Sequence, residues 1–67
     1  MNVVSGQRVA GFLILIDSDD CRYAVRLSAV LALIDVDSCR DATLMILSGG
    51  RQVTLPHRLD DVLNWIA

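Results

Sequence analysis

The amino-acid sequence predicts an α+β fold: a twisted antiparallel β-meander of four to five strands with one C-terminal helix packed on a face. Three observations support this prediction. Two β-rich runs flank the pair Gly49-Gly50, several short segments are rich in apolar residues, and residues 57–67 show a helical period. A chain of 67 residues is expected to form one small domain, 1–67.

The N-terminal part is expected to supply the first strand. Residues 1–7 are predicted to be either a loose terminus or a short edge strand. Residues 8–17 are predicted to form one strand, because the run 12–16 is apolar on both pleat faces, as in a strand that is covered on both sides. The polar cluster 18–20 predicts a turn.

The middle of the chain continues the predicted meander. Residues 22–27 alternate in polarity and are predicted to form the second strand. Residues 28–30 are expected to form a single helical turn at a corner, and residues 31–37 the third strand, followed by a turn at 38–41. The side chains expected to be buried in the third strand are Leu31, Leu33 and Ile34.

A hairpin is the strongest local prediction. Gly49-Gly50 lies between the runs 43–48 and 51–55, and hairpin turns need positive φ angles, which glycine adopts without a Cβ clash. Pro56 lacks an N–H group and should end the last strand.

The last segment, 57–67, is predicted to be a helix. Asp60 and Asp61 would lie in its first turn, where the helix dipole favours negative charge. Its apolar residues follow the spacing i, i+3, i+4, i+7 and predict one buried stripe. The members of this stripe are Leu59, Val62, Leu63 and Ile66.

Composition suggests self-association. Hydrophobic residues make up 54% of the chain and the mean hydropathy is +0.50, although so short a chain has little interior in which to bury them. We therefore expect a homo-oligomer, most simply a dimer, or an apolar contact with a protein partner whose identity the sequence does not give. A well-packed monomer with an apolar surface is the alternative.

Charge and cysteine content limit which partners and which cellular location are expected for the protein. The formal net charge is −2, so the whole chain has no electrostatic attraction to nucleic acid or to an anionic membrane, although a local arginine surface would still bind phosphate. The longest apolar run is too short for a membrane span, and no secretory signal is visible. The protein is expected to be cytoplasmic, with Cys21 and Cys39 as free, partly buried thiols.

The predicted meander places two aspartate-rich turns and the start of the helix at one end of the sheet. Carboxylates beside a histidine can hold a divalent cation, and Asp19, Asp20, Asp37 and His57 are the candidates for such a site. Aspartate is also a common turn residue, and no metal-binding spacing is present. We therefore expect turn chemistry at this end, with no metal and no cofactor. The wider set at this end is Asp17, Asp19, Asp20, Asp37, Asp41, Cys21, Cys39 and His57.

Candidate interaction residues are one tryptophan and four arginines. Trp65 is predicted either as a contact residue or as the closure of the core under the helix. The arginines are Arg22, Arg26, Arg51 and Arg58, and they carry the alternative interpretation of a nucleic-acid surface.

Part of the chain resembles a known family. Val30, Leu33 and Ile34, then Thr43, Met45 and Leu47, then Gly49-Gly50, and finally the helical stripe match the pattern of the small flagellar and swarming-motility regulatory proteins of the FlbD/SwrD type. The resemblance covers about two thirds of the chain, and every match is a structural position. No functional residue is transferred from that family.

Together these observations predict a small, non-catalytic interaction or regulatory module of bacterial or phage type, acting through protein–protein contacts and self-association. The alternative is a small nucleic-acid-binding regulator that uses an arginine surface. An enzyme is not expected, because no catalytic motif is present and so short a chain leaves little room for a shaped pocket.

Overall fold

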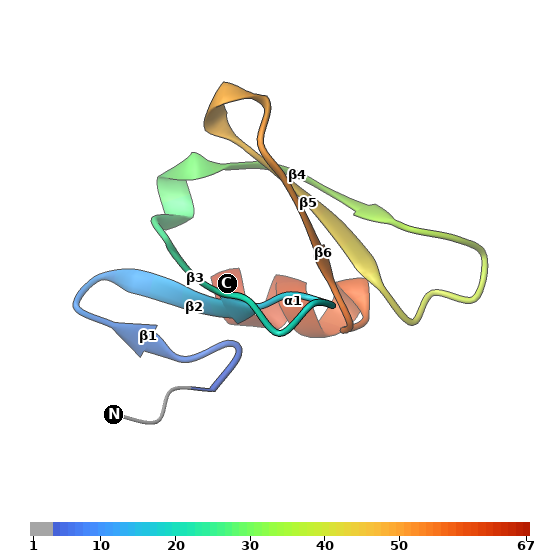
Figure 1. Ribbon diagram of the computed structural model, residues 1–67, viewed down its shortest axis with the longest axis horizontal. Helices are drawn as coiled ribbons and strands as arrows, with labels where there is room; N and C mark the ends of the chain where they lie inside the picture. Colours follow the sequence, from blue (N-terminus) through green and yellow to red (C-terminus); the bar gives the residue numbers. More distant parts are fainter. Residues whose placement is uncertain (1–3) are drawn as a thin grey trace.

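The computed structural model describes residues 4–67 and has an α+β architecture of two three-stranded antiparallel sheets and one helix (Figure 1). The first sheet has the order β1-β2-β3 and the second the order β4-β5-β6. The elements are β1 (Arg8–Val9), β2 (Phe12–Ile16), β3 (Arg22–Val25), the 3₁₀ turn η1 (Leu27–Ala29), β4 (Val30–Asp35), β5 (Thr43–Leu47), the 3₁₀ turn η2 (Ser48–Gly50), β6 (Gln52–Leu55) and the helix α1 (Leu59–Ile66).

The expected single strand over residues 8–17 is wrong, because the chain turns back within it. Ala10 and Gly11 both have positive φ angles, 53° and 84°, and join β1 to β2 as a two-residue hairpin. Two successive positive φ angles are the mark of a type I′ turn. The sequence signal was weak, since alanine rarely adopts this conformation and only Gly11 favours it.

Of the expected N-terminal segment 1–7, the described residues 4–7 are hydrogen-bonded to the first sheet. The Gly6 N–H donates to the Ile14 carbonyl at 2.8 Å, and the Ile14 N–H donates to the Gln7 carbonyl, also at 2.8 Å. These bonds extend the β1–β2 pairing toward the N-terminus. Residues 1–3 lie outside the described part of the chain.

The Gly49-Gly50 hairpin is confirmed. β5 and β6 are antiparallel, with Met45 opposite Val53, and the loop between them is η2. The turn therefore spans three residues rather than the glycine pair alone. β6 ends at Leu55, directly before Pro56, as expected from the missing proline N–H.

The single continuous meander is wrong, because β3 and β4 do not pair and the sheet divides there. The helical turn predicted at 28–30 is present one residue earlier, as η1, where the Ala29 N–H donates to the Arg26 carbonyl at 2.9 Å. This turn redirects the chain, so β4 begins a second sheet at an angle to the first (Figure 1).

One core lies between the two sheets and the helix. It combines side chains of β2 and β3 with side chains of β5 and β6, and Val62 of α1 completes it. Thr43 is a fully buried polar residue, and its hydroxyl donates to the His57 carbonyl at 2.8 Å, which satisfies it. The buried apolar members are Leu13, Leu15, Val25, Met45, Leu47, Val53, Leu55 and Val62.

The predicted helix is confirmed, but its buried face is rotated. Val62 is fully buried and Trp65 and Ile66 pack against the core, whereas Leu63 is 46% exposed. The face that meets the sheets is therefore centred on Val62, and Leu63 lies at its margin. In an α-helix, neighbouring residues are 100° apart, so a small rotation exchanges one flank of the stripe for the other.

The predicted burial in the third strand is also wrong for two residues. Leu31 is 66% exposed and Ile34 is 46% exposed, while Leu33 is half-buried against the core. β4 is the outermost strand of its sheet, and a bulge between Val30 and Ala32 turns Leu31 out of the regular alternation. The sequence predicts burial of these apolar residues because nothing local shows that the strand lies at an edge.

Candidate functional site

The aspartates of the predicted acidic end serve as turn residues. Asp17 Oδ1 accepts hydrogen bonds from the N–H groups of Asp19 and Cys21, both at 2.9 Å, and Asp37 Oδ1 accepts one from the Cys39 N–H at 3.0 Å. Such side-chain bonds to the backbone two to four residues ahead stabilise turns.

The wider set of this end does not come together as a ligand cluster. Between residues 4 and 67, no three His, Cys, Asp or Glu side chains are grouped closely enough to hold a metal ion. Asp19 and Asp20 are exposed, and the ring of His57 packs edge-on against Trp65, with centroids 4.9 Å apart and planes at 72°. Cys21 and Cys39 are free thiols, and both are exposed rather than partly buried.

The carboxylate of Asp17 also changes the pKa of Tyr23, the only tyrosine. A hydrogen bond to the Asp17 carboxylate, followed by the negative charge of that carboxylate, raises the pKa of Tyr23 above its ordinary value of 10.0.

Trp65 closes the core at the helix end. Its indole ring covers Gly6, so closely that a Cβ added to Gly6 would lie 2.6 Å from Trp65 Cε2. The Arg8 guanidinium donates to the Trp65 carbonyl at 2.8 Å and to the Ala67 carbonyl at 3.3 Å. These contacts join the N-terminal segment to the end of α1, and they favour the core-closing role over the contact role.

The four candidate arginines have different surroundings. Arg26 lies over the Phe12 ring at 4.8 Å, and Arg58 forms an ion pair with Asp60 at 3.9 Å. Arg22 is exposed on β3, and Arg51 follows the η2 loop. Two of the four cations are thus already engaged with other side chains of the same chain.

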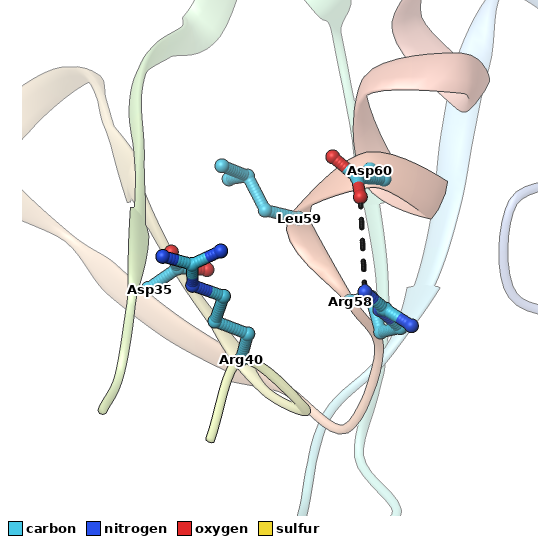
Figure 2. A pocket seen from close by; sticks show the side chains of 5 residues that line it. All are labelled: Asp35, Arg40, Arg58, Leu59 and Asp60. Atoms are coloured by element: carbon cyan, nitrogen blue, oxygen red, sulfur yellow. Dashed lines mark ion pairs between the residues drawn. The ribbon is translucent and has the colours of Figure 1, made fainter. Parts of the chain in front are cut away.

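A small open hollow lies between the end of β4, the β4–β5 turn and the start of α1 (Figure 2). Its volume is ≈ 210 Å³, and Asp35, Arg40, Arg58, Leu59 and Asp60 line it. Asp35 Oδ1 is buried and has no hydrogen-bond partner among the described residues. The two guanidinium groups balance the two carboxylates, so the hollow does not favour an anion or a cation by net charge. Nothing in the sequence distinguishes Asp35 or Arg40 from other polar residues, because one ends a strand and the other lies in a turn.

A second feature that the sequence did not show is the outer face of the β4–β5–β6 sheet. The register places Leu33, Met45 and Val53 in one row on the core side. The rows beside it point to the opposite face, because side chains alternate along a strand. That outer face consists of Ala32, Ile34, Leu44, Ile46, Gln52 and Thr54.

The outer face is apolar except at β6. On β4 and β5 its residues are aliphatic, and Gln52 and Thr54 supply the polar groups. Val36, 49% exposed, follows β4 beside it. Since α1 and the first sheet pack on the core side, neither covers this face. The row Ile34, Leu44 and Thr54 runs across it from one edge of the sheet to the other.

β4 also forms an open edge of the sheet. It pairs with β5 on one side, and no strand within residues 4–67 pairs with it on the other. The Val36 N–H donates to the Ala42 carbonyl at 3.2 Å, so residues 32, 34 and 36 direct their backbone groups toward β5. The alternate residues, Leu33 and Asp35, therefore direct their N–H and C=O groups outward.

Comparison with family models, curated proteins and solved structures finds no match to this chain. The resemblance to the flagellar and swarming-motility regulatory proteins accordingly stays a prediction. Within the described residues, no helix has the length and apolar character needed to cross a membrane.

Proposed function

We propose that this protein is a small, non-catalytic interaction module that self-associates, as a dimer in the simplest case, and in that form contacts a protein partner. The observation that carries the proposal is the outer face of the β4–β5–β6 sheet, which is aliphatic on two of its three strands and is not covered by α1 or by the first sheet. Its location in the cytoplasm is part of the same proposal.

Burial of this face would be favourable. Removing apolar surface from water contributes roughly 25 cal/mol per Å², and Ile34 and Val36 each keep nearly half of their surface exposed in the single chain. A partly exposed aliphatic face on so small a domain is typical of a protein contact surface. The polar residues Gln52 and Thr54 then mark the rim of that surface, as in other interfaces.

The hollow beside α1 supports a structural role more than a chemical one. Its polar groups are two arginines and two aspartates, and Arg58 and Asp60 already form an ion pair there. No serine, cysteine or histidine lines it. The proposal therefore assigns no catalytic role to the hollow, and none to the exposed thiols.

Light scattering coupled to size exclusion tests the proposal, with a concentration series at low and at moderate salt. The expected result is a mass that approaches twice 7.3 kDa as concentration rises and that moderate salt does not reduce, because the contact is apolar. The variant Ile34→Lys, at an exposed residue of the outer face on the edge strand β4, should shift the protein toward monomer. The matched control is Val4→Lys, which makes the same kind of change at an exposed apolar residue outside the outer face.

A monomer at every concentration would remove self-association from the proposal. A monomer that binds DNA or RNA with strong salt dependence would favour the alternative of an arginine surface instead. Loss of the dimer in both variants alike would mean that the contact does not use the outer face.

A further inference from the structure

The open edge of β4 lacks several of the devices that keep strand edges apart. Natural edges are usually protected by charged residues, above all lysine, by proline, by short length or by a bulge. The stretch 32–37 has neither lysine nor proline, its charges are Asp35 and Asp37, and the bulge of β4 lies before it, between Val30 and Ala32. Leu33 and Asp35 therefore each direct a free N–H and C=O group outward from the edge. The exposed side chains of Ile34 and Val36 alternate with them along the strand.

We propose that β4 pairs antiparallel with β4 of a second copy, around a two-fold axis at Ile34. This inference rests on the proposed self-association and specifies how it is built. Leu33 of each copy lies opposite Asp35 of the other, and these two pairs exchange backbone hydrogen bonds. The two sheets then join into one continuous sheet across the axis.

The position of the axis follows from the backbone and the charges. An axis at Asp35 would place two carboxylates directly opposite each other, which is destabilising. An axis at Leu33 would pair Asp35 with Leu31, and the bulge has removed Leu31 from the regular ladder. The axis at Ile34 uses both regular residues, Leu33 and Asp35, as the hydrogen-bonded pairs, and no like charges lie directly opposite each other.

The same register also pairs the exposed aliphatic side chains. Ile34 lies opposite Ile34 of the second copy, and Val36 lies opposite Ala32, all on the outer face. These are non-hydrogen-bonded positions, where side chains approach most closely. The outer faces of the two copies therefore become one surface, wide enough to present to a protein partner.

The two-fold arrangement closes on itself. Because the same edge is used by both copies, the contact satisfies β4 and leaves no β4 edge for a third chain. Pairing of β4 with the β1 or β3 edge of another copy would instead be head-to-tail and would continue into a polymer.

The size of the contact predicts a reversible dimer. The regularly paired stretch 32–36 is ~17 Å long, and a sheet with its side chains is ~10 Å thick. Such a strip buries on the order of a few hundred Å² per copy, which places it among the small interfaces of transient complexes. The dimer should accordingly dissociate on dilution.

Cross-linking by a single cysteine tests this register. In a Cys21→Ser, Cys39→Ser background, Ile34→Cys would place two thiols opposite each other, with Cα atoms ~4.5 Å apart, within the range that a disulfide spans. The expected result of mild oxidation is a shift from the monomer band to a band of twice the mass on a non-reducing gel. Thr54→Cys in the same background is the control, because it lies on the same face at the far edge of the sheet.

A second pair of variants covers the case in which reduced Ile34→Cys associates poorly. Ala32→Cys mixed with Val36→Cys should yield a cross-linked heterodimer, while each variant alone should not cross-link. Absence of both cross-links in a protein whose parent is dimeric by light scattering would overturn the β4 pairing and leave the proposed self-association standing. A parent protein that is monomeric would overturn both the β4 pairing and the proposed self-association. Gel bands above twice the monomer mass, or equal cross-linking of the Thr54→Cys control, would overturn the two-fold pairing at the β4 edge.

Discussion

Gly6 is the residue on which the N-terminal segment depends most closely. It has a φ of +90°, and the indole ring of Trp65 occupies the space that a Cβ would need. Gly6→Ala therefore combines an unfavourable backbone conformation, about 1–2 kcal/mol, with displacement of the ring. We expect urea denaturation to show a loss of unfolding free energy larger than that of Gly11→Ala.

Gly11→Ala is the matched control for this prediction. Gly11 has a similar φ of +84°, but no atom of the described residues lies within 4 Å of its added Cβ. It should therefore report backbone strain alone, and its tryptophan fluorescence should stay unchanged while that of Gly6→Ala shifts. Equal losses in the two variants would show that the packing of Trp65 on Gly6 contributes nothing to stability.

Tyr23 provides a pH-dependent signal at the residue scale. Because the hydrogen bond to Asp17 and its charge raise the pKa of Tyr23 above 10.0, the stabilisation from this contact is present below about pH 10. It is lost as the pH rises through the folded-state pKa. A spectrophotometric titration of the only tyrosine should show a midpoint above 10 in the native protein.

Asp17→Asn should lower that midpoint toward the ordinary value. Asparagine keeps an oxygen that can accept the N–H groups of Asp19 and Cys21, so the turn can be retained while the negative charge is removed. Arg51 acts in the opposite direction, lowering the pKa of Tyr23, so Arg51→Gln should raise the midpoint slightly. An unchanged midpoint in Asp17→Asn would contradict the Tyr23–Asp17 contact.

At the scale of the element, α1 has a buried face that differs from the one its sequence suggests. Val62→Ala should cost roughly 1.5–3 kcal/mol of unfolding free energy, because Val62 is fully buried in the core. Leu63→Ala should cost less than about 1 kcal/mol, although leucine is the larger residue, since Leu63 is almost half exposed.

Chemical denaturation of these two variants measures the rotation of the helix directly. If the whole apolar stripe predicted from the sequence were buried, Leu63→Ala would lose more unfolding free energy than Val62→Ala, because leucine is the larger residue. The observed packing predicts the opposite ranking. A larger loss for Leu63→Ala in dilute, monomeric protein would contradict the observed packing. The comparison must be made under dilute conditions, because an exposed leucine can gain contacts on association.

At the scale of the whole molecule, association and stability should be coupled. A dimer that forms only from folded chains stabilises the native state by mass action, so the thermal midpoint should rise with protein concentration. The variant Ile34→Lys should show a midpoint that is independent of concentration, and Val4→Lys should behave like the parent. Scanning calorimetry over a wide concentration range checks this, and a constant midpoint in the parent would contradict folding-coupled association.

The sequence by itself determined the local elements of this protein. The Gly49-Gly50 hairpin, the strand end before Pro56, the helix after it and the helical turn near residues 27–30 all follow from short-range chemistry: glycine reaches positive φ, proline lacks an N–H group, and apolar residues repeat at a helical spacing. The α+β class follows from these elements. The Asp17 and Asp37 turns were predictable for the same reason, since each carboxylate bonds to its own neighbourhood.

Only the tertiary structure decided which elements meet. The break between β3 and β4, the exposure of Leu31, the rotation that leaves Leu63 at the margin of α1, and the meeting of Asp35 and Arg40 with the helix start all depend on residues distant in sequence. An apolar side chain looks the same in the sequence whether its strand lies inside a sheet or at its edge. Burial is a property of the surface that other segments cover, and the outer face and the open β4 edge were therefore visible only after the two sheets had been placed around one core.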